Sequence, residues 1–125
     1  MQKDNDTPNI EQYKQYWSKK IKENKEKLEE RKRTLTHYAK LCSNFLKENF
    51  QVKKVYLIGS LARDYKIHEN SDIDLVVEGL EDKQYFRALN KLFELVPDGI
   101  HIDLITKETA SHSLKEIIKA QGVVI

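Results

Sequence analysis

Residues 71–77, Ser-Asp-Ile-Asp-Leu-Val-Val, decide how the rest of this chain of 125 residues is interpreted. The apolar run after the aspartates predicts a buried strand, and side chains two residues apart on a strand project from the same face. Asp72 and Asp74 are therefore expected to point the same way. Asp103 has a similar apolar frame in residues 101–105, His-Ile-Asp-Leu-Ile. If the two strands are neighbours in one sheet, three carboxylates converge.

Three converging carboxylates require compensation by cations. At separations of about 5 Å and an effective dielectric constant near 20, each pair repels by roughly 3 kcal/mol. Hard divalent cations with oxygen ligands relieve this repulsion. Two Mg²⁺ ions about 3.5 to 4 Å apart are the usual means of holding the attacking and leaving oxygens during phosphoryl or nucleotidyl transfer. We therefore predict a two-magnesium site at Asp72, Asp74 and Asp103.

The competing interpretation of the Asp-x-Asp pattern is a turn or a helix cap in a charged sequence. An apolar strand follows this pair directly, and Gly59-Ser60 ends another apolar run twelve positions before Asp72. A glycine at the end of a strand lets the backbone approach a phosphate, and Ser60 with the N–H groups of the following turn can donate to phosphate oxygens. Arg63, one turn further on, is a candidate to pair with the same phosphates. Without the aspartates, Gly59-Ser60 would be interpreted as an ordinary turn with an N-cap.

The surrounding sequence alternates between helical and strand periods. Its turn signals include Pro97-Asp98-Gly99 and Gly122. Strands are expected at residues 52–58, 71–77, 100–105 and 123–125, and further helices from Ser60, at 81–96 and at 109–119. The amphipathic period of 81–96 places Phe86, Leu89, Leu92, Phe93 and Val96 inward.

The first part of the chain is different in character. Residues 1–9 are polar and are expected to form a disordered leader. Residues 10–49 contain neither Gly nor Pro, which favours one long helix with Thr34 or Thr36 as the candidate position of a break. Its middle is highly charged, so we expect the ends of the helix to pack and the middle to stand in solvent. The heptad positions that support this helix are Ile21, Leu28, Leu35 and Cys42.

Charge divides the chain into a basic and an acidic part. Residues 1–54 carry 14 Lys and Arg against 8 Asp and Glu, whereas residues 55–125 carry 8 against 12. Tyr13, Tyr16 and Trp17 on the basic helix could stack on nucleic-acid bases. Mixed charge runs on helices are usually solvated faces, however, and burial of the aromatic residues against a partner protein or a second copy is the better explanation. We do not expect a nucleic-acid partner.

Composition excludes several classes of protein. An apolar content of 39% concentrated after Val55 is not typical of a wholly disordered chain. No apolar run approaches the roughly 20 residues needed to span a bilayer, and the N-terminus lacks the pattern of a secretory signal. Cys42 is the only cysteine, so an intramolecular disulfide is excluded. These features predict a cytoplasmic protein.

Residues 59–63, 71–75 and 102–104 together resemble the signature of the minimal nucleotidyltransferases, small members of the DNA polymerase β-like superfamily. The resemblance covers about residues 55–125. It implies an α+β fold in which a mixed β-sheet is flanked by helices, with the long N-terminal helix as an addition. The expected organisation is a disordered leader at 1–9, a long helix at 10–50 and a minimal nucleotidyltransferase domain at 51–125.

Within this group, chains of this length resemble the MntA-type antitoxins, which accompany HEPN-type ribonuclease toxins and silence them by transferring AMP from ATP to a tyrosine. The resemblance implies that Gly59 and Ser60 hold the triphosphate, with Arg63 as a further contact. It implies that Asp72 and Asp74 bind both Mg²⁺ ions, and that Asp103 binds the metal that activates the acceptor hydroxyl and accepts its proton. The implied partner is a cognate HEPN-type toxin in a hetero-oligomer, without a membrane.

Two alternatives remain open at this point. The chain could act as a non-catalytic antitoxin that occludes its partner through the long helix, with the nucleotide site idle. It could instead be a nucleotidyltransferase that modifies a small molecule, such as an antibiotic, or the 3′ end of an RNA.

Overall fold

A four-stranded mixed β-sheet forms the centre of the molecule. The computed structural model describes residues 9–62 and 72–125, so Arg63 and Ser71 lie outside the described residues. The strands are β1 (Lys54–Ile58), β2 (Ile73–Glu78), β3 (Ile102–Thr106) and β4 (Val123–Val124). The helices are α1 (Ile10–Phe50), α2 (Tyr85–Leu95) and α3 (His112–Gln121), with 3-10 turns η1 (Asp82–Gln84) and η2 (Lys107–Thr109).

The strand order across the sheet is β3-β2-β1-β4. β1 pairs antiparallel with both β2 and β4, whereas β2 and β3 run parallel. The parallel pair is joined through α2, because parallel neighbours require a crossover connection. This topology confirms the predicted α+β fold with a mixed sheet, helices against it and a long N-terminal helix.

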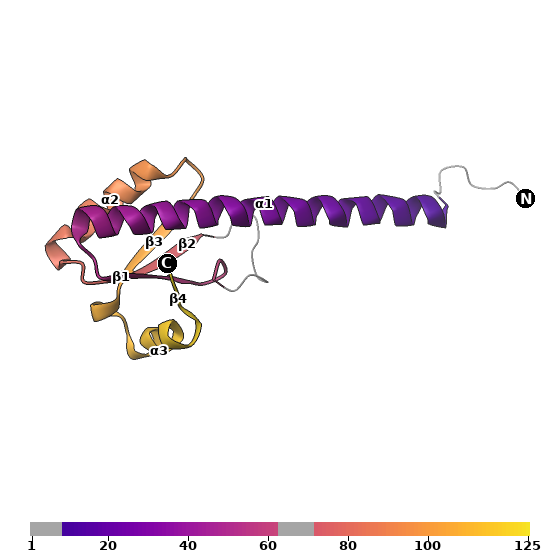
Figure 1. The fold of residues 1–125 in the computed structure, drawn as a ribbon. Coiled ribbons are helices and arrows are strands. Elements are labelled where there is room, and N and C mark those ends of the chain that lie inside the picture. Colours follow the sequence, from indigo (N-terminus) through magenta and orange to yellow (C-terminus); the bar gives the residue numbers. More distant parts are fainter. Residues whose placement is uncertain (1–8, 63–71) are drawn as a thin grey trace, which may run out of the picture.

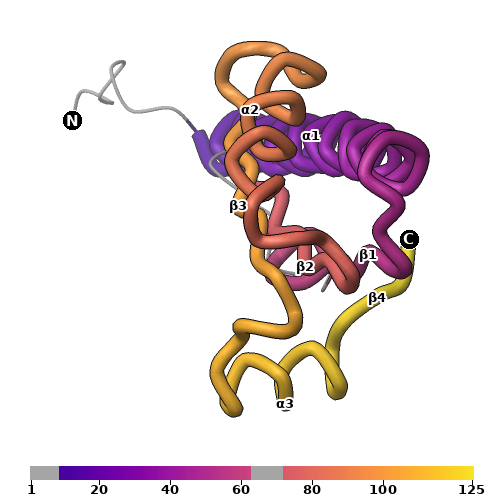
Figure 2. Tube along the Cα trace, turned by 90° about the vertical axis from the view of Figure 1, so that its left-hand side faces the viewer, coloured from indigo at the N-terminus to yellow at the C-terminus, as the bar shows by residue number. Residues whose placement is uncertain are grey.

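The helices cover the two faces of the sheet unequally. α1 and α2 lie on one face, and α3 lies on the other (Figures 1 and 2). The larger core lies under α1 and α2 and is formed by apolar side chains of both helices and the sheet, among them Leu35, Leu46, Val55, Ile73, Leu75 and Leu92. The smaller core lies under α3 and joins Ile58, Val76 and Ile118. The face that α3 covers only in part is the one that carries the candidate site.

α1 is continuous over its 41 residues, so the candidate break at Thr34 or Thr36 is wrong. The side chain of Asn9 caps the first turn by accepting from the Gln12 amide at 2.8 Å, and the helix ends where Gln51 adopts a left-handed φ of 57°. Its C-terminal half packs on the sheet, whereas its N-terminal half projects beyond the body (Figure 1).

Two inward assignments on α2 are wrong. Phe86 and Phe93 are exposed, while Ala88 and Leu92 form the buried line of this helix. An amphipathic period gives the direction of the buried face but not its width, and here only a narrow strip meets α1 and the sheet.

Within the described ranges, none of the helices is both long enough and apolar enough to cross a membrane.

Candidate active site

Gly59 follows β1 directly and adopts a positive φ of 79°. A Cβ at this position would lie closer than 3.0 Å to Oδ2 of Asp74, which is tighter than side chains tolerate. The glycine is therefore needed for two reasons, the backbone conformation and the room for the Asp74 carboxylate. The second reason cannot be inferred from the sequence, because it depends on a contact between residues 15 positions apart.

Asp74 and Asp103 are direct partners in the parallel β2–β3 register. Ile58, the residue before Gly59, pairs with Asp74 on the other side. Side chains at these positions share the sheet face of Val76 and Ile105, because strand residues two apart project the same way. The last residue of β1 and the first residues of β2 and β3 thus meet at one end of the sheet, on the face that packs against α3.

The three aspartates differ in burial. Asp72 and Asp103 are exposed, and Asp74 is half-buried between them. Burial raises the pKa of the Asp74 carboxyl above its ordinary value, and the negative charges of Asp103 and then Asp72 raise that pKa further. The charges of both neighbouring carboxylates thus contribute to the electrostatic environment of Asp74.

Among the described residues, no group of three or more His, Cys, Asp or Glu side chains is arranged to hold a metal ion. The donor set nevertheless fits magnesium, which binds through one or two carboxylates and keeps several waters and phosphate oxygens as its other ligands. A divalent cation would also relieve the repulsion between the half-buried Asp74 carboxylate and the other two.

The predicted phosphate contacts are placed only in part. Ser60 lies in the turn of residues 60–62 that follows β1, and its side chain is partly exposed. The helix expected to open at Ser60 is a turn over its described residues. Arg63 lies outside the described residues, so its contact with phosphate stays a prediction.

A surface hollow of about 510 Å³ adjoins Asp103 along the outer edge of β3. Tyr85 closes part of it by donating from its hydroxyl to the Leu104 carbonyl at 2.5 Å. Phe86 beside it is 74% exposed, which is unusual for a large aromatic ring. The other side chains around the hollow belong to η1, β3 and η2, namely Asp82, Ile105, Thr106 and Thr109.

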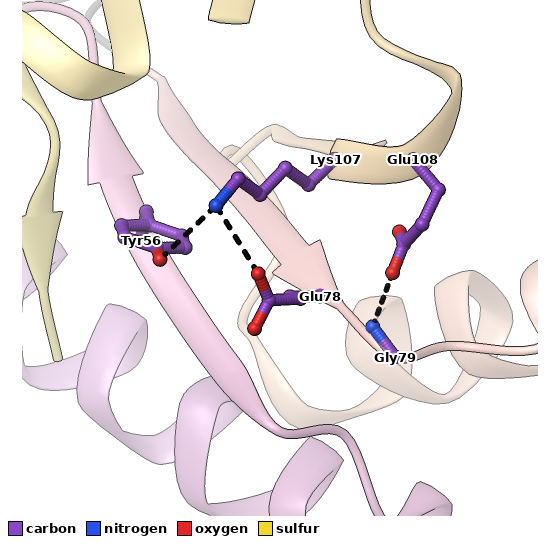
Figure 3. A network of polar contacts seen from close by, with 5 residues as sticks. All are labelled: Tyr56, Glu78, Gly79, Lys107 and Glu108. Atoms are coloured by element: carbon purple, nitrogen blue, oxygen red, sulfur yellow. Dashed lines mark hydrogen bonds and ion pairs between the residues drawn. The ribbon is translucent and has the colours of Figure 1, made fainter.

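A polar network at the opposite end of the same sheet face was not anticipated from the sequence. Lys107 lies 3.1 Å from the Glu78 carboxylate and 3.5 Å from the Tyr56 hydroxyl, and the Gly79 amide donates to Glu108 at 2.6 Å (Figure 3). Hydrogen bonds to Glu78 and Tyr56 raise the pKa of the Lys107 ammonium. Glu78 is four residues from Asp74, or about 13 Å along the strand. The network therefore fastens η2 to the sheet and does not reach the carboxylates.

Comparison with known families gives a match to the nucleotidyltransferase domain over residues 39–125. The match begins inside α1, at the half of this helix that packs on the sheet. It leaves the projecting half of α1 outside.

Curated relatives match about half of the chain. A protein of Methanocaldococcus jannaschii, MJ1215, named for an inferred protein adenylyltransferase activity, is 42% identical over 69 residues, which are 51% of this chain and 74% of the relative. A second protein of that organism, MJ0128, with the same kind of name, is 39% identical over 64 residues, covering 50% of this chain and 63% of the relative.

Solved structures of toxin–antitoxin complexes share the fold. A toxin–antitoxin structure with AMP-PNP is 27% identical, with a TM-score of 0.55 over 65% of this chain and 66% of the other. The MntA–HepT complex is 22% identical, with a TM-score of 0.53 over 71% and 69% of the two chains. Sequence, sheet topology and family match agree, and this chain belongs to the nucleotidyltransferase domain family.

Proposed function

We propose that this chain is an antitoxin that transfers AMP from ATP to a tyrosine of a HEPN-type ribonuclease toxin, with two Mg²⁺ ions as cofactors. The observation that carries the proposal is the placement of Asp74 against Gly59 and in register with Asp103. Support comes from relatives named as protein adenylyltransferases and from a similar toxin–antitoxin structure that holds AMP-PNP.

The proposed reaction is a nucleotidyl transfer. The tyrosine oxygen forms a bond to the α-phosphorus of ATP while the bond from that phosphorus to the bridging oxygen of the β-phosphate breaks. Pyrophosphate leaves with the bond electrons, and the hydroxyl proton passes to a base. Asp103 is the candidate base, because its exposed carboxylate borders the hollow from which an acceptor can approach.

Each residue of the site has a proposed task. Asp72 and Asp74 would hold the metals, and Asp103 would hold the one that activates the acceptor hydroxyl. When bound, Mg²⁺ supplies positive charge that stabilises the α-phosphate and the departing pyrophosphate. Gly59 keeps Asp74 in place, and Ser60 and its turn donate to the triphosphate, with Arg63 as a further contact.

The hollow beside β3 supports a protein acceptor. Its volume of about 510 Å³ accommodates a tyrosine side chain with neighbouring backbone. Phe86 offers an exposed ring on which an acceptor ring can pack edge to face. An acceptor seated here presents its hydroxyl to Asp103.

The test uses labelled ATP, Mg²⁺ and the cognate toxin with the intact chain. Asp74→Asn and Asp72→Asn should each reduce AMP transfer by at least about a hundredfold, as expected when a ligand of a catalytic metal is lost. Asp98→Asn removes an exposed carboxylate from a turn before β3 and should leave transfer unchanged. Full transfer by both site variants would refute the assignment.

The acceptor is tested in the same assay. Label should appear on a tyrosine of the toxin and disappear when that tyrosine is replaced by phenylalanine. Label on an RNA 3′ end or an aminoglycoside, with none on the toxin, would favour the alternative acceptors.

Occlusion is the second candidate function, and the exposed N-terminal half of α1 favours it. In that case the Asp74→Asn protein neutralises the toxin as well as the wild type does, at one antitoxin per toxin. Under the enzymatic proposal, substoichiometric wild type suffices and the variant fails.

The proposed reaction places the protein in the cytoplasm, where ATP and the RNA targets of the toxin are found. The proposed catalytic unit is residues 51–125, resting on the packed half of α1 and joined to its toxin in a hetero-oligomer.

A further inference from the structure

The N-terminal half of α1, residues 10–27, exposes large apolar side chains. The exposed fractions are 71% for Ile10, 54% for Tyr13, 52% for Trp17 and 65% for Ile21. We call these four residues the outer stripe. Residues 10–27 span about 27 Å of helix, and Figure 1 shows this half projecting beyond the body. Neither the nucleotide site nor the hollow beside β3 explains why these four side chains are exposed.

The outer stripe continues the buried face of the same helix. At about 100° per residue, each of its four members lies within about 40° of Leu35 around the helix axis. The buried residues Ala39, Cys42 and Leu46 fall in the same sector. The helix therefore carries one face that is apolar over most of its length, interrupted by Asn24 and Arg31 in the same sector. The sheet covers the second half of that face, and in the described part of the chain the first half stands open.

The surface along the outer stripe is not flat but contains small hollows. One of about 370 Å³ lies among Ile10, Tyr13, Lys14 and Trp17. The Tyr16 ring meets the Trp17 indole edge to face, with ring centroids 5.4 Å apart. The Tyr16 ring therefore packs against one side of the indole.

The borders of the outer stripe are basic on both sides. Lys14 and Lys20 lie about 60° to either side of Leu35, and Lys25 and Lys27 about 80° to either side. We call these four residues the lysine margins. The acidic residues of the same half, Glu11, Glu23 and Glu26, lie about 120° or more away, on the back of the helix. The flanks of the outer stripe are therefore basic only, whereas the back of the helix carries both signs, with Lys19 and Lys22 beside these glutamates.

This distribution of charge disfavours a second copy of the chain as the occupant. Two outer stripes packed against each other, parallel or antiparallel, would bring lysine margins against lysine margins. Like charges at these flanking positions oppose pairing, and opposite charges select the partner.

The direction of the outer stripe disfavours a flat surface. The stripe lies in the same sector of α1 as the residues that pack on the sheet, so it faces the side of the helix on which the sheet lies. The body therefore stands at one end of the stripe, because this half of α1 projects beyond it (Figure 1). A membrane lying flat on the stripe would meet the body, whereas a helix can lie in the corner between the two.

We infer that the outer stripe binds an acidic amphipathic helix of a partner protein, with glutamates or aspartates of that helix against the lysine margins. This interface does not include the catalytic aspartates. It is formed by a segment that the nucleotidyltransferase match does not include. Failure of the proposed transfer reaction therefore leaves this inference standing, and the reverse also holds.

Trp17 supplies the measurement, because it is the only tryptophan of the chain. The probes are two tryptophan-free helical peptides of three heptads with leucine at a and d. One carries glutamate at e and g, and the other carries lysine there. Titration of the full chain with the acidic peptide should shift the Trp17 emission to the blue and saturate, with affinity at least about tenfold above that for the basic peptide. Equal affinities, or no response to either peptide, would overturn the inference.

Charge reversal sharpens the test. The quadruple variant K14E/K20E/K25E/K27E should reverse the preference to the basic peptide. The matched variant K19E/K22E changes charge on the back of the helix and should keep the original preference. An unchanged preference in the quadruple variant would contradict the role of the lysine margins.

Other occupants are outcomes of the same experiment. Sedimentation of the chain alone at 100 µM and low salt should show a monomer, and a dimer lost on Trp17→Ala would overturn the inference in favour of a second copy. A saturating blue shift with anionic vesicles or with a 12-nucleotide single-stranded RNA, but not with the acidic peptide, would equally overturn it.

Discussion

At the scale of single residues, the contact between Gly59 and Asp74 links backbone conformation to chemistry. The glycine ends β1 with a positive φ and leaves the space that the Asp74 carboxylate occupies. Asp103 lies beside Asp74 in register, so one backbone position supports the carboxylate at the centre of the proposed metal site.

Gly59→Ala should therefore combine a stability loss with a loss of function. A positive φ costs an alanine about 1–2 kcal/mol, and the new methyl group must also displace the Asp74 carboxylate. Gly99→Ala is the matched control, since Gly99 has a φ of 92° but no described atom within 4 Å of the added methyl. We expect both variants to lose stability in urea denaturation, Gly59→Ala at least as much as Gly99→Ala, and loss of AMP transfer only in Gly59→Ala. Full transfer by Gly59→Ala would show that the position of Asp74 is not critical.

Asp74→Asn should stabilise the metal-free protein while abolishing transfer. The raised pKa of Asp74 means that its charged form is disfavoured in the fold, so stability is lost as the pH rises through that pKa, above the ordinary value of 3.8. In EDTA, the Tm of the variant should exceed that of the wild type increasingly from pH 4 to pH 7. Added Mg²⁺ should raise the wild-type Tm at pH 7 and the variant Tm less. A lower Tm for the variant under all these conditions would contradict the account.

The buried Cys42 thiol should make the stability of the protein depend on pH in the alkaline range. Burial raises the pKa of its thiol to about 11 from an ordinary 9.0. The folded state thus favours the neutral thiol, so stability is complete below pH 9 and falls as the pH rises from there to about 11. Alkaline denaturation of Cys42→Ala, whose lower starting stability reflects the cavity, should show a shallower decline. An equally steep decline would assign the effect to other groups.

At the scale of elements, the sequence predicted the four strands and the long helix, because their period and turn signals are local. It also predicted three acidic residues on neighbouring strands. What it did not predict depended on contacts distant in sequence, namely the Asp74 carboxylate over Gly59 and the Lys107 network with Glu78. The inward assignment of Phe86 and Phe93 failed because the width of a docking face is set by the neighbouring elements.

At the scale of the whole molecule, α1 has two parts with different energetics. Its C-terminal half shares the core with the sheet, whereas its N-terminal half has the same apolar face without cover in the described chain. The periodicity of the sequence predicts one helix that includes both halves. Only the position of the sheet shows where the packed half ends.

Substitutions along α1 should separate these two parts. Leu35→Ala removes a fully buried side chain and should lower the free energy of unfolding by about 2–5 kcal/mol. Trp17→Ala removes a half-exposed one and should change it by less than about 0.5 kcal/mol. Urea denaturation followed by circular dichroism measures both. Comparable losses would mean that the N-terminal half packs on the body in solution.

The central claim is that the three carboxylates beside Gly59 catalyse AMP transfer to a protein. The most direct measurement is the mass of the cognate toxin after incubation with ATP, Mg²⁺ and either wild-type or Asp74→Asn protein. We expect one or more added AMP groups on toxin tyrosine with the wild type and none with the variant. An unmodified toxin in both reactions, or equal modification in both, would contradict it.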